Sequence, residues 1–593
     1  MCQGRQSSDW FQWSPRRAFS GFTKSQKAEL TKTRSGGGAL RDPVVGLALA
    51  LAGLPVLVAS ALFARAACSS IGLHLPPAAV TACVSSLALV CAWSAVGPVL
   101  KLTSAVRAAH QRSLALRGLP GPQYGLLGIL PFLRARKDLH RQVTEWAEQY
   151  GPIFKVRCIN YHAVVITDPV LATCVLRDKV LDKVRFQYHF LDPFLGGVNI
   201  LTGPTDDHWR AVRKGVSPAF SAVRMRDACN VVAQCALQLV HIIAARPQTP
   251  RNIDNLLLRE SMDVIGRIGF NKDMGALRAV EDAHAVDQAD LMVRSTHEVT
   301  LRIYEPYRVH KLWKPSSIVA GLLAHMRSTD PLPGSFAQLL LATQDPSTKQ
   351  PLADHLMIPE IASLFFAGID TTGHTGTWVL YLLSQHPEVE EKLLRELDAL
   401  ELLATPSRPH PRPVSPQDLG RLSFLQAIIK EALRLYPPVG IGQIRVSRRH
   451  DITLAGKLHL PRGTLLWVPH HAIQNTSFNW DQPDKFLPER WLEKGQEYAD
   501  VSKLRLPAEW YEGMGVGTGT PLPSSAEDCT GAPSCTAKRY MPFAEGPRDC
   551  LGQNLAKTSL LASIATLVAH LHFDLADRMQ GPAGSVITFR PCQ

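Results

Sequence analysis

A single cysteine stands between a loop containing glycine and proline and the start of an apolar helix, in the segment MPFAEGPRDCLGQNLA at residues 541–556. Gly546 and Gly552 allow backbone amides to approach the sulfur of Cys550, and a helix that starts at about Leu551 directs its positive end toward it. Both features stabilise a thiolate. The cysteine is therefore a metal ligand, a nucleophile or a packing residue, and the rest of the sequence has to distinguish the three.

Length and composition set broad limits on the kind of protein. With 593 residues, of which 46% are hydrophobic, the chain can bury a large core in one domain or several. Its twelve cysteines are scattered, unlike those of a disulfide-rich secreted domain, so a reducing compartment is expected. The net charge of +13 comes from dispersed basic residues, which argues against nucleic acid as a partner. An anionic membrane surface, an acidic protein partner and a basic surface without a partner stay open.

The N-terminal region has the pattern of a targeting and membrane segment. Residues 43–64 and 78–100 are uncharged stretches, each long enough to cross a hydrocarbon core of roughly 30 Å. Residues 1–42 hold eight Lys and Arg against three Asp and Glu, which suits a two-helix hairpin with both ends on the positive side. Residues 43–102 are thus predicted to be a membrane anchor, with one span plus a buried or interfacial segment as the alternative. The basic segment also suits an organellar transit peptide.

The remainder, residues 103–593, is predicted to be one catalytic domain with a Pro/Gly-rich joint at Leu116–Gly125. Helical periodicity dominates, and short strand-like runs such as IFKVRCI and HAVVITD accompany it, so the fold class is mainly α with small β-sheets. Residues 492–540 are rich in Gly, Pro, Ser and Thr, and a surface-loop insertion is predicted there. The clearest helical patterns cover Arg136–Tyr150, Ile358–Ser384 and Phe424–Leu435.

The residues around Cys550 resemble those of a known family. A cysteine thiolate is a good ligand for haem iron and pushes electron density toward the metal. The spacing matches the haem-binding signature FxxGxRxCxG of the cytochrome P-450 superfamily at Phe543, Gly546, Arg548, Cys550 and Gly552. The resemblance implies that Cys550 is the axial ligand of haem b, that Phe543 packs beside it, and that Arg548 meets a haem propionate.

Two further segments, in the family's order along the chain, strengthen the resemblance. In KEALRLYPPV, Glu431 and Arg434 lie three residues apart on one helix face and resemble the family's ExxR element. In FLPERW, Arg490 is similar to the arginine of the family's PERF-type segment, with Trp491 in place of phenylalanine. The resemblance implies that Glu431, Arg434 and Arg490 form a structural triad that braces the haem-binding core, because buried charges persist when they are paired.

The apolar segment LFFAGIDTTGHTGTWVLYLLSQHP, residues 364–387, resembles the family's oxygen-binding helix, AGxDTT. Small residues such as Ala367 and Gly368 are expected to let haem and dioxygen lie against this helix, and a threonine within it can bend the helix. The resemblance implies that Thr371 donates a hydrogen bond to iron-bound peroxide and that Asp370 relays protons from solvent. Isomerases and dehydratases of the haem-thiolate type often lack this acid–alcohol pair, so its presence favours oxygen activation.

Other residues are expected to contact the haem propionates. Trp209 and Arg213 lie four apart in DHWRAVRK and resemble the family's WxxxR element. Arg445, in the strand-like run IRVSRRHD, is the predicted third contact. Three histidines match no motif and are predicted to be ordinary structural or surface residues: His374, His470 and His471.

The resemblance, which covers about residues 119–591, implies a haem-thiolate monooxygenase that inserts one atom of O2 into a lipophilic substrate such as a fatty acid, sterol, carotenoid or other terpenoid. No dinucleotide fingerprint or flavin domain is visible, so NADPH-derived electrons would arrive through a separate reductase, or through ferredoxin if the protein is organellar. The endoplasmic reticulum membrane is the expected location, and a chloroplast or other organelle membrane is the alternative.

Two departures from the family and two alternative functions accompany this prediction. The insertion before the haem loop is longer than usual, and the chain ends at VITFRPCQ, about where the family continues into a hairpin. A haem-thiolate isomerase or dehydratase that needs no external electrons is one alternative. A membrane haem-binding protein without catalysis is the other. The predicted substrate contacts are Phe190–Leu201, Phe365, Phe366, Ala367 and Val439–Ile444.

Overall fold

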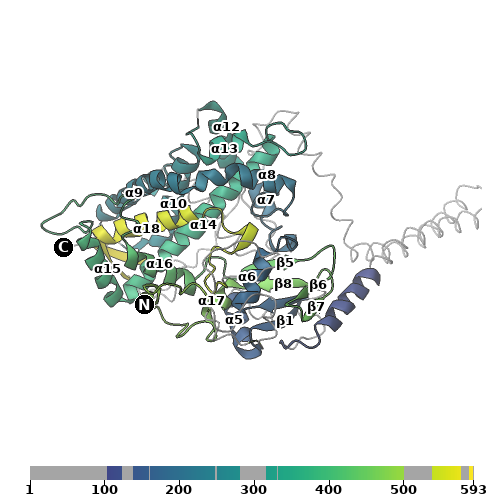
Figure 1. Cartoon of the computed structure of the whole chain (residues 1–593). Coiled ribbons are helices and arrows are strands. Elements are labelled where there is room, and N and C mark those ends of the chain that lie inside the picture. The colour runs from purple at the N-terminus through teal and green to yellow at the C-terminus, as the bar shows by residue number, and fades with distance from the viewer. Residues whose placement is uncertain are drawn as a thin grey trace, which may run out of the picture. The chain divides into compact units, whose positions relative to one another are not determined.

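Four long helices pack together at the centre of the domain (Figure 1). They are α9 (Ala222–Ala244), α10 (Ile253–Phe270), α14 (Asp354–Gln385) and α18 (Gln553–His570). Helix α10 lies along α14, and α18 packs against α9 and α14. Most of their inward residues are Leu, Ile, Val and Ala with almost no exposed surface, so burial of apolar area drives this packing.

The computed structural model describes residues 103–122, 138–158, 161–246, 250–280, 316–329, 331–499, 506, 537–575 and 586–591. Residues up to Gln111 form a separate unit, and Arg112 begins the large unit to which all elements named below belong. The predicted targeting segment, residues 1–42, and the predicted membrane anchor, residues 43–102, lie outside the described residues. Both stay predictions.

The helix-helix contact between α10 and α14 depends on glycine. A methyl group on Gly368 would come within 2.6 Å of the Ile265 side chain, and one on Gly373 within 2.8 Å of Leu258. Because real side-chain carbons do not approach this closely, only glycine allows the two helices to lie at this distance. Gly368 was among the small residues of α14 expected to make room for a cofactor, and that expectation stays a prediction. The structure adds a second role for Gly368 and Gly373, which is to allow the approach of α10.

Shorter helices surround the central four. Those with bounds in the structure are α5 (Leu139–Tyr150), α6 (Pro169–Arg177), α7 (Asp192–Leu195), α8 (Asp207–Val216), α12 (Ser316–Ser328), α13 (Phe336–Ala342), α15 (Pro387–Ala399), α16 (Ser423–Leu435) and α17 (His470–Asn475). The predicted helices at α5, α14 and α16 are confirmed, with ends that differ by a few residues.

The main sheet has five strands in the order β1-β2-β8-β5-β3. Their bounds are Ile153–Cys158, Tyr161–Ile166, Leu465–Val468, Gln443–Val446 and Asp182–Lys183. The pair β2 and β8 is parallel and the other neighbours are antiparallel. Helices α5, α6 and α17 lie beside this sheet (Figure 1). The predicted fold class, mainly α with small sheets, is confirmed.

Two smaller sheets complete the described part of the fold. One has three strands in the order β4 (Arg251–Asn252), β10 (Val586–Pro591) and β9 (Leu571–Leu575), and the other pairs β6 (Ile452–Leu454) with β7 (Leu458–Leu460). Among the described residues, α9 is the one helix whose length and composition would suit a membrane span, and 56% of that stretch is buried in the protein.

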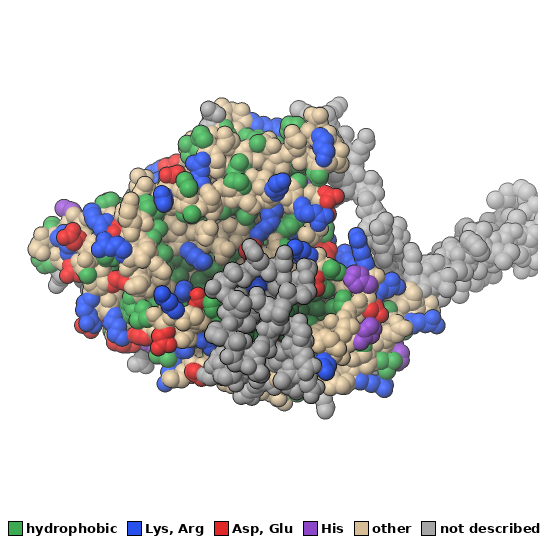
Figure 2. All heavy atoms as spheres, viewed as in Figure 1, with side chains coloured by type: hydrophobic (Ala, Val, Ile, Leu, Met, Phe, Trp, Pro, Cys, Tyr) green, Lys and Arg blue, Asp and Glu red, His purple; other side chains and the backbone are tan. Residues whose placement is uncertain are grey.

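The two ends of the predicted insertion, residues 492–540, lie side by side. Tyr498 forms a β-bridge with Lys538, and the Ala499 amide donates to the Ala537 carbonyl at 2.7 Å. The chain therefore leaves and returns at one point, as an inserted loop would. Figure 2 shows Lys and Arg side chains spread over the visible face among acidic ones rather than gathered in one stripe.

The α10–α14 contact can be tested with a pair of glycine substitutions. Gly373→Ala should lower the free energy of unfolding by about 1–3 kcal/mol, because the new methyl group forces the helices apart. Gly321→Ala is the control, since Gly321 lies on α12 and an added methyl group there would meet no other atom within 4 Å. That change should raise stability by about 0.5–1 kcal/mol. Guanidinium unfolding of the detergent-solubilised full chain measures both, and equal effects of the two changes would contradict the role given to Gly373.

Candidate functional site

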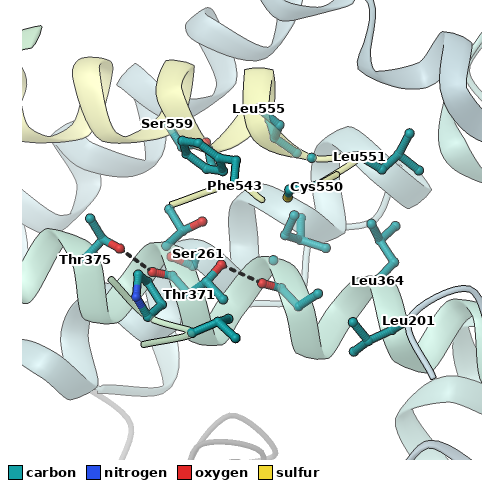
Figure 3. A pocket seen from close by; sticks show the side chains of 18 of the residues that line it. Leu201, Ser261, Leu364, Thr371, Thr375, Phe543, Cys550, Leu551, Leu555 and Ser559 are labelled. Atoms are coloured by element: carbon teal, nitrogen blue, oxygen red, sulfur yellow. Dashed lines mark hydrogen bonds between the residues drawn. The ribbon is translucent and has the colours of Figure 1, made fainter. Parts of the chain in front are cut away.

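A cavity lies between α14 and the segment that leads into α18 (Figure 3). Ala367 and Thr371 contribute to the wall formed by α14, and Phe543, Cys550 and Leu555 contribute to the opposite wall. The cavity surface is mostly apolar, and the charged side chains that line it are Lys183, Arg213, Arg548, Glu260, Glu360 and Asp549. Thus the structure brings together the cysteine and the threonine that were predicted from separate motifs.

Residues 541–552, called the cysteine loop below, have a conformation that requires glycine at one position. Gly546 has φ +77°, and a methyl group on it would lie 2.4 Å from the Leu176 carbonyl oxygen. At Gly552 a methyl group would meet no other atom within 4 Å. The Cys550 amide donates to the Phe543 carbonyl at 2.8 Å, which closes the loop. Helix α18 begins at Gln553, two residues later than predicted.

The sulfur of Cys550 is accessible from the cavity, although protein surrounds the loop. Burial raises the pKa of the Cys550 thiol, while the backbone amide of Gly552 and the cations Arg213 and Lys557 act in the lowering direction. Burial is the largest of these effects, so the site by itself favours the thiol. A metal cation bound to the sulfur reverses this balance, because it deprotonates a coordinating thiol. The environment therefore suits a metal-bound cysteine better than a free nucleophile.

Buried cations gather beside the cavity without enough negative charge to balance them. Lys183 and Arg445 are direct partners in the antiparallel pair β3–β5, so their side chains share one face of the sheet. Like charges directly opposite each other are destabilising. Burial, with help from Arg548 and Arg445, lowers the pKa of Lys183 well below its usual range, and burial lowers the pKa of Arg548 to about 10. Sequence reasoning missed Lys183, since only strand pairing brings it to Arg445.

Two of these buried cations have a hydrogen-bond donor without an acceptor among the described residues. Nη1 of Arg445 and Nη1 of Arg548 are buried and have no hydrogen-bond partner among the described residues. Lys183 donates to the Leu201 carbonyl at 2.6 Å, and its ammonium group lies 3.6 Å from the ring centre of Tyr188. Unpaired buried donors are costly, so this part of the cavity is suited to an anionic group such as a carboxylate.

Trp209 and Arg213 lie on α8 at the cavity, but their donors are used within the protein. The Trp209 indole donates to the Ile200 carbonyl at 3.1 Å, and its ring lies 4.2 Å from the Arg548 guanidinium. Arg213 donates to the Asp549 carbonyl at 3.0 Å and to its carboxylate. Both were predicted to contact a propionate, and that role stays a prediction. Their described contacts also hold the cysteine loop and Arg548 in place.

Thr371 and Asp370 are neighbours on α14 that face different surroundings. The Thr371 hydroxyl lies at the cavity and donates to the Ala367 carbonyl at 2.8 Å, one turn earlier in the same helix (Figure 3). The Asp370 carboxylate is not part of the cavity wall, and its Oδ1 lies 3.3 Å from Nε2 of His374. The helix thus carries an alcohol inside the site and an acid just outside it.

The predicted triad surrounds a carboxylate with no exposed surface. Glu431 accepts bonds from Nε and Nη2 of Arg434, both at 2.9 Å, and from Nε of Arg490 at 3.1 Å. The Trp491 indole, which replaces the family's phenylalanine, also donates to Glu431, at 2.8 Å. Each oxygen of the buried charge is therefore well satisfied.

A hydrogen-bond chain joins the triad to the cysteine loop. Arg434 donates to the Gln474 carbonyl at 2.9 Å, and the Gln474 side-chain amide donates to the Leu433 carbonyl at 2.9 Å. The side-chain oxygen of Gln474 then accepts the Met541 amide at 2.9 Å, where the cysteine loop begins. Glu545 fixes the loop a second time, because Arg177 of α6 lies 3.0 Å from its carboxylate. The triad and α6 together set the position of Cys550.

Comparison with known proteins agrees with these features. A family model described as Cytochrome P450 matches residues 119–583. The chain is 23% identical to rabbit (Oryctolagus cuniculus) cytochrome P450 3A6 over 492 residues, which cover 78% of this chain and 87% of that protein. It is 22% identical to human cytochrome P450 3A7 over 505 residues, covering 80% and 90%. It is 25% identical to Drosophila melanogaster cytochrome P450 4d2 over 497 residues, covering 76% and 88%.

Two tryptophan substitutions test the charge on Glu431. Trp491→Phe should cost about 1.5–3 kcal/mol of unfolding free energy, because it removes a donor from a buried charge. Trp480→Phe is the matched control, since the Trp480 indole donates to the neutral Ile473 carbonyl at 3.2 Å. Its cost should be about 0.5–1.5 kcal/mol. Denaturant titrations of the full chain compare the two, and a larger loss for Trp480→Phe would show that ring volume rather than charge determines the effect.

Proposed function

The chain belongs to the cytochrome P450 family, and we propose that it is a haem-thiolate monooxygenase that acts on a lipophilic substrate with electrons from a separate reductase. Family membership supports the general reaction class. The observation that carries the proposal is the placement of Cys550 and Thr371 on opposite walls of one apolar cavity.

The residues around the cavity fit a haem group. Cys550 offers a sulfur on one wall, and Ala367 and Thr371 leave the facing wall free of large side chains. The unpartnered Nη1 atoms of Arg445 and Arg548 suit the two carboxylates of a porphyrin, and Lys183 adds a third positive charge. Charge compensation at its carboxylates and a thiolate ligand at the centre are the two demands that haem makes on a protein.

The residues have distinct proposed roles. When bound, haem supplies the activation of dioxygen, which the cysteine thiolate favours by donating electron density to the iron. Arg445, Arg548 and Lys183 would bind and orient the carboxylates of the cofactor. The Thr371 hydroxyl can hold a proton at the cavity wall, and the apolar lining excludes water from the rest of the site. Asp370 would exchange protons with solvent from outside the wall.

The substrate site is proposed to be the apolar part of the same cavity. Ile200, Leu201 and Val439 line it, from two of the segments that were predicted to contact substrate. Of the helix residues in that prediction, Ala367 lines the cavity, whereas Phe365 packs against Phe270 at a ring distance of 5.3 Å within the core.

Leu364 lines the cavity, and Phe366 packs edge-on against Phe194 at 5.7 Å. Thus the predicted contact through Phe365 and Phe366 is wrong for the described cavity, because the helical turn points both rings toward other helices. A mostly apolar lining favours a lipophilic substrate such as a fatty acid, sterol, carotenoid or other terpenoid. An NADPH-dependent reductase and the endoplasmic reticulum membrane remain part of the proposal.

The ligand role of Cys550 has a direct spectroscopic test. The reduced, carbon-monoxide-bound protein should show the red-shifted absorption band of a thiolate ligand, and Cys550→Ala should abolish it. Cys235→Ala is the control, because Cys235 is fully buried in the α9 core and should leave the band unchanged. A band that survives Cys550→Ala, or its absence from the wild-type protein, rejects the proposal.

The proton role of Thr371 can be tested without a known substrate. With reductase, NADPH and oxygen, Thr371→Ala should raise the hydrogen peroxide released per NADPH consumed severalfold, because the hydroxyl that holds the proton is gone. Thr566→Ala is the control. Thr566 is buried on α18 and makes the same kind of bond to its own helix, to the Ala562 carbonyl at 2.7 Å. Peroxide yields that stay equal in all three proteins would contradict the role of Thr371.

A further inference from the structure

His374 lies one turn after Asp370 on α14 and bridges two carboxylates. Its Nδ1 is 2.7 Å from Oδ1 of Asp254, which lies in the first turn of α10, and its Nε2 is 3.3 Å from Oδ1 of Asp370. Both ring nitrogens must carry protons to serve two carboxylates at once. The geometry therefore describes an imidazolium held between two anions.

The surroundings of His374 keep this positive charge. Burial acts to lower the pKa of His374, but hydrogen bonds and charge attraction from Asp254 and Asp370 outweigh it and raise the pKa to about 10. Among the described residues, these two carboxylates are the charged groups that face the ring, one from its own helix and one from α10. The Thr377 hydroxyl donates to Asp254 at 3.0 Å and fixes the far end of the bridge.

Asp370 depends on this contact. Its Oδ1 atom is buried, and no hydrogen bond of good geometry reaches it from the described residues. His374 is the one cation found in contact with it in the part of the chain that the structure describes. The imidazolium is therefore the contact that can fix the position of this carboxylate.

We propose that His374 is a positioning residue that holds the Asp370 carboxylate in the orientation in which it exchanges protons with solvent for the reaction. This inference rests on the proposed function, in which Asp370 exchanges protons with solvent. His374 itself transfers no proton in the proposal. Its side chain is 42% exposed, so it forms the boundary between solvent and the buried carboxylate.

The paired contacts of His374 with Asp254 and Asp370, called the bridge below, should affect the stability of the protein in a way that can be measured without catalysis. The pKa of His374 is raised on folding from 6.5 to about 10, so its contribution to stability is complete below about pH 6.5 and is lost as the pH rises through 10. The melting temperature of His374→Gln should therefore fall below that of the wild type by the largest amount at or below about pH 6.5, and the difference should shrink steadily at higher pH and close by about pH 10.5. A difference that does not change with pH overturns the charged bridge.

A second measurement reads the effect on Asp370. With reductase, NADPH and oxygen but no added substrate, the share of electrons released as hydrogen peroxide should rise severalfold in His374→Gln, because the carboxylate that His374 orients is no longer held in place. An unchanged share overturns the proposal even if the stability result holds.

Two further variants complete the design. His386→Gln is the control, since His386 ends the same helix and contacts a carboxylate, Glu388, at 3.1 Å. It should show no stability difference from the wild type that closes with rising pH, and it should leave the peroxide share unchanged. Asp254→Asn keeps the His374–Asp370 contact but removes one anion that raises the pKa of His374, so the stability gained from a protonated His374 should be lost at a lower pH in this variant than in the wild type. It also serves if His374→Gln does not fold.

Failure of the proposed function and failure of this inference give different results. If the wild-type protein shows no thiolate band with carbon monoxide, the monooxygenase proposal fails, whereas the pH-dependent stability difference still reports on the bridge. If the thiolate band is present in both wild type and His374→Gln but the peroxide share is the same in both, the enzyme assignment stands and the role of His374 is rejected.

Discussion

A fully buried carboxylate, that of Glu431, determines where the reactive cysteine lies. Arg434 and the Trp491 indole both donate hydrogen bonds to it within the protein. The same arginine extends the network to Gln474, whose side chain accepts the first amide of the cysteine loop. Because a hydrogen bond to an ion is directional and costly to leave unmade, this network fixes a loop that has little regular structure of its own.

The buried positive charges at the cavity, unlike Glu431, are not balanced within the protein. Lys183, Arg445 and Arg548 are buried near one another, and Nη1 of each arginine has no hydrogen-bond partner among the described residues, which is an arrangement that a folded chain tolerates only at a cost. A dianionic ligand at this place removes the repulsion and satisfies the donors together. Binding and folding are then linked, since a ligand that binds only the folded state stabilises it by mass action. We therefore expect the cofactor to be part of the folded protein rather than a late addition.

Local motifs predicted much of the fold class, and they identified two residues that the structure places at the cavity. Cys550 and Thr371 meet there because each lies at a fixed position in its own loop or helix. Contacts between residues far apart in the sequence could not be predicted from local motifs. Lys183 is an example, because it reaches Arg445 only through strand pairing between β3 and β5. His374 shows an intermediate case, since its spacing from Asp370 suits one helix face, whereas its second partner lies on another helix.

Predictions from the sequence were wrong where one sequence pattern is compatible with two structural roles. An apolar residue on α14 can face the cavity or a neighbouring helix, and the rotation of the helix decides, so Phe365 was assigned to the wrong side. Glycine has the same ambiguity. Gly368 lies at the cavity, but the absence of a side chain there is required by the approach of Ile265. Only the packed helices distinguish these alternatives.

The bridge between Tyr498 and Lys538 fixes the two ends of the predicted insertion at one place. Closing a loop at fixed ends costs only about 0.6 kcal/mol more for each doubling of its length. Between these ends, Leu506 packs against the apolar cluster of Val170 and Ala537. The length of the insertion can therefore vary at little cost in folding free energy, whereas a polar residue at position 506 would disturb the core of the domain.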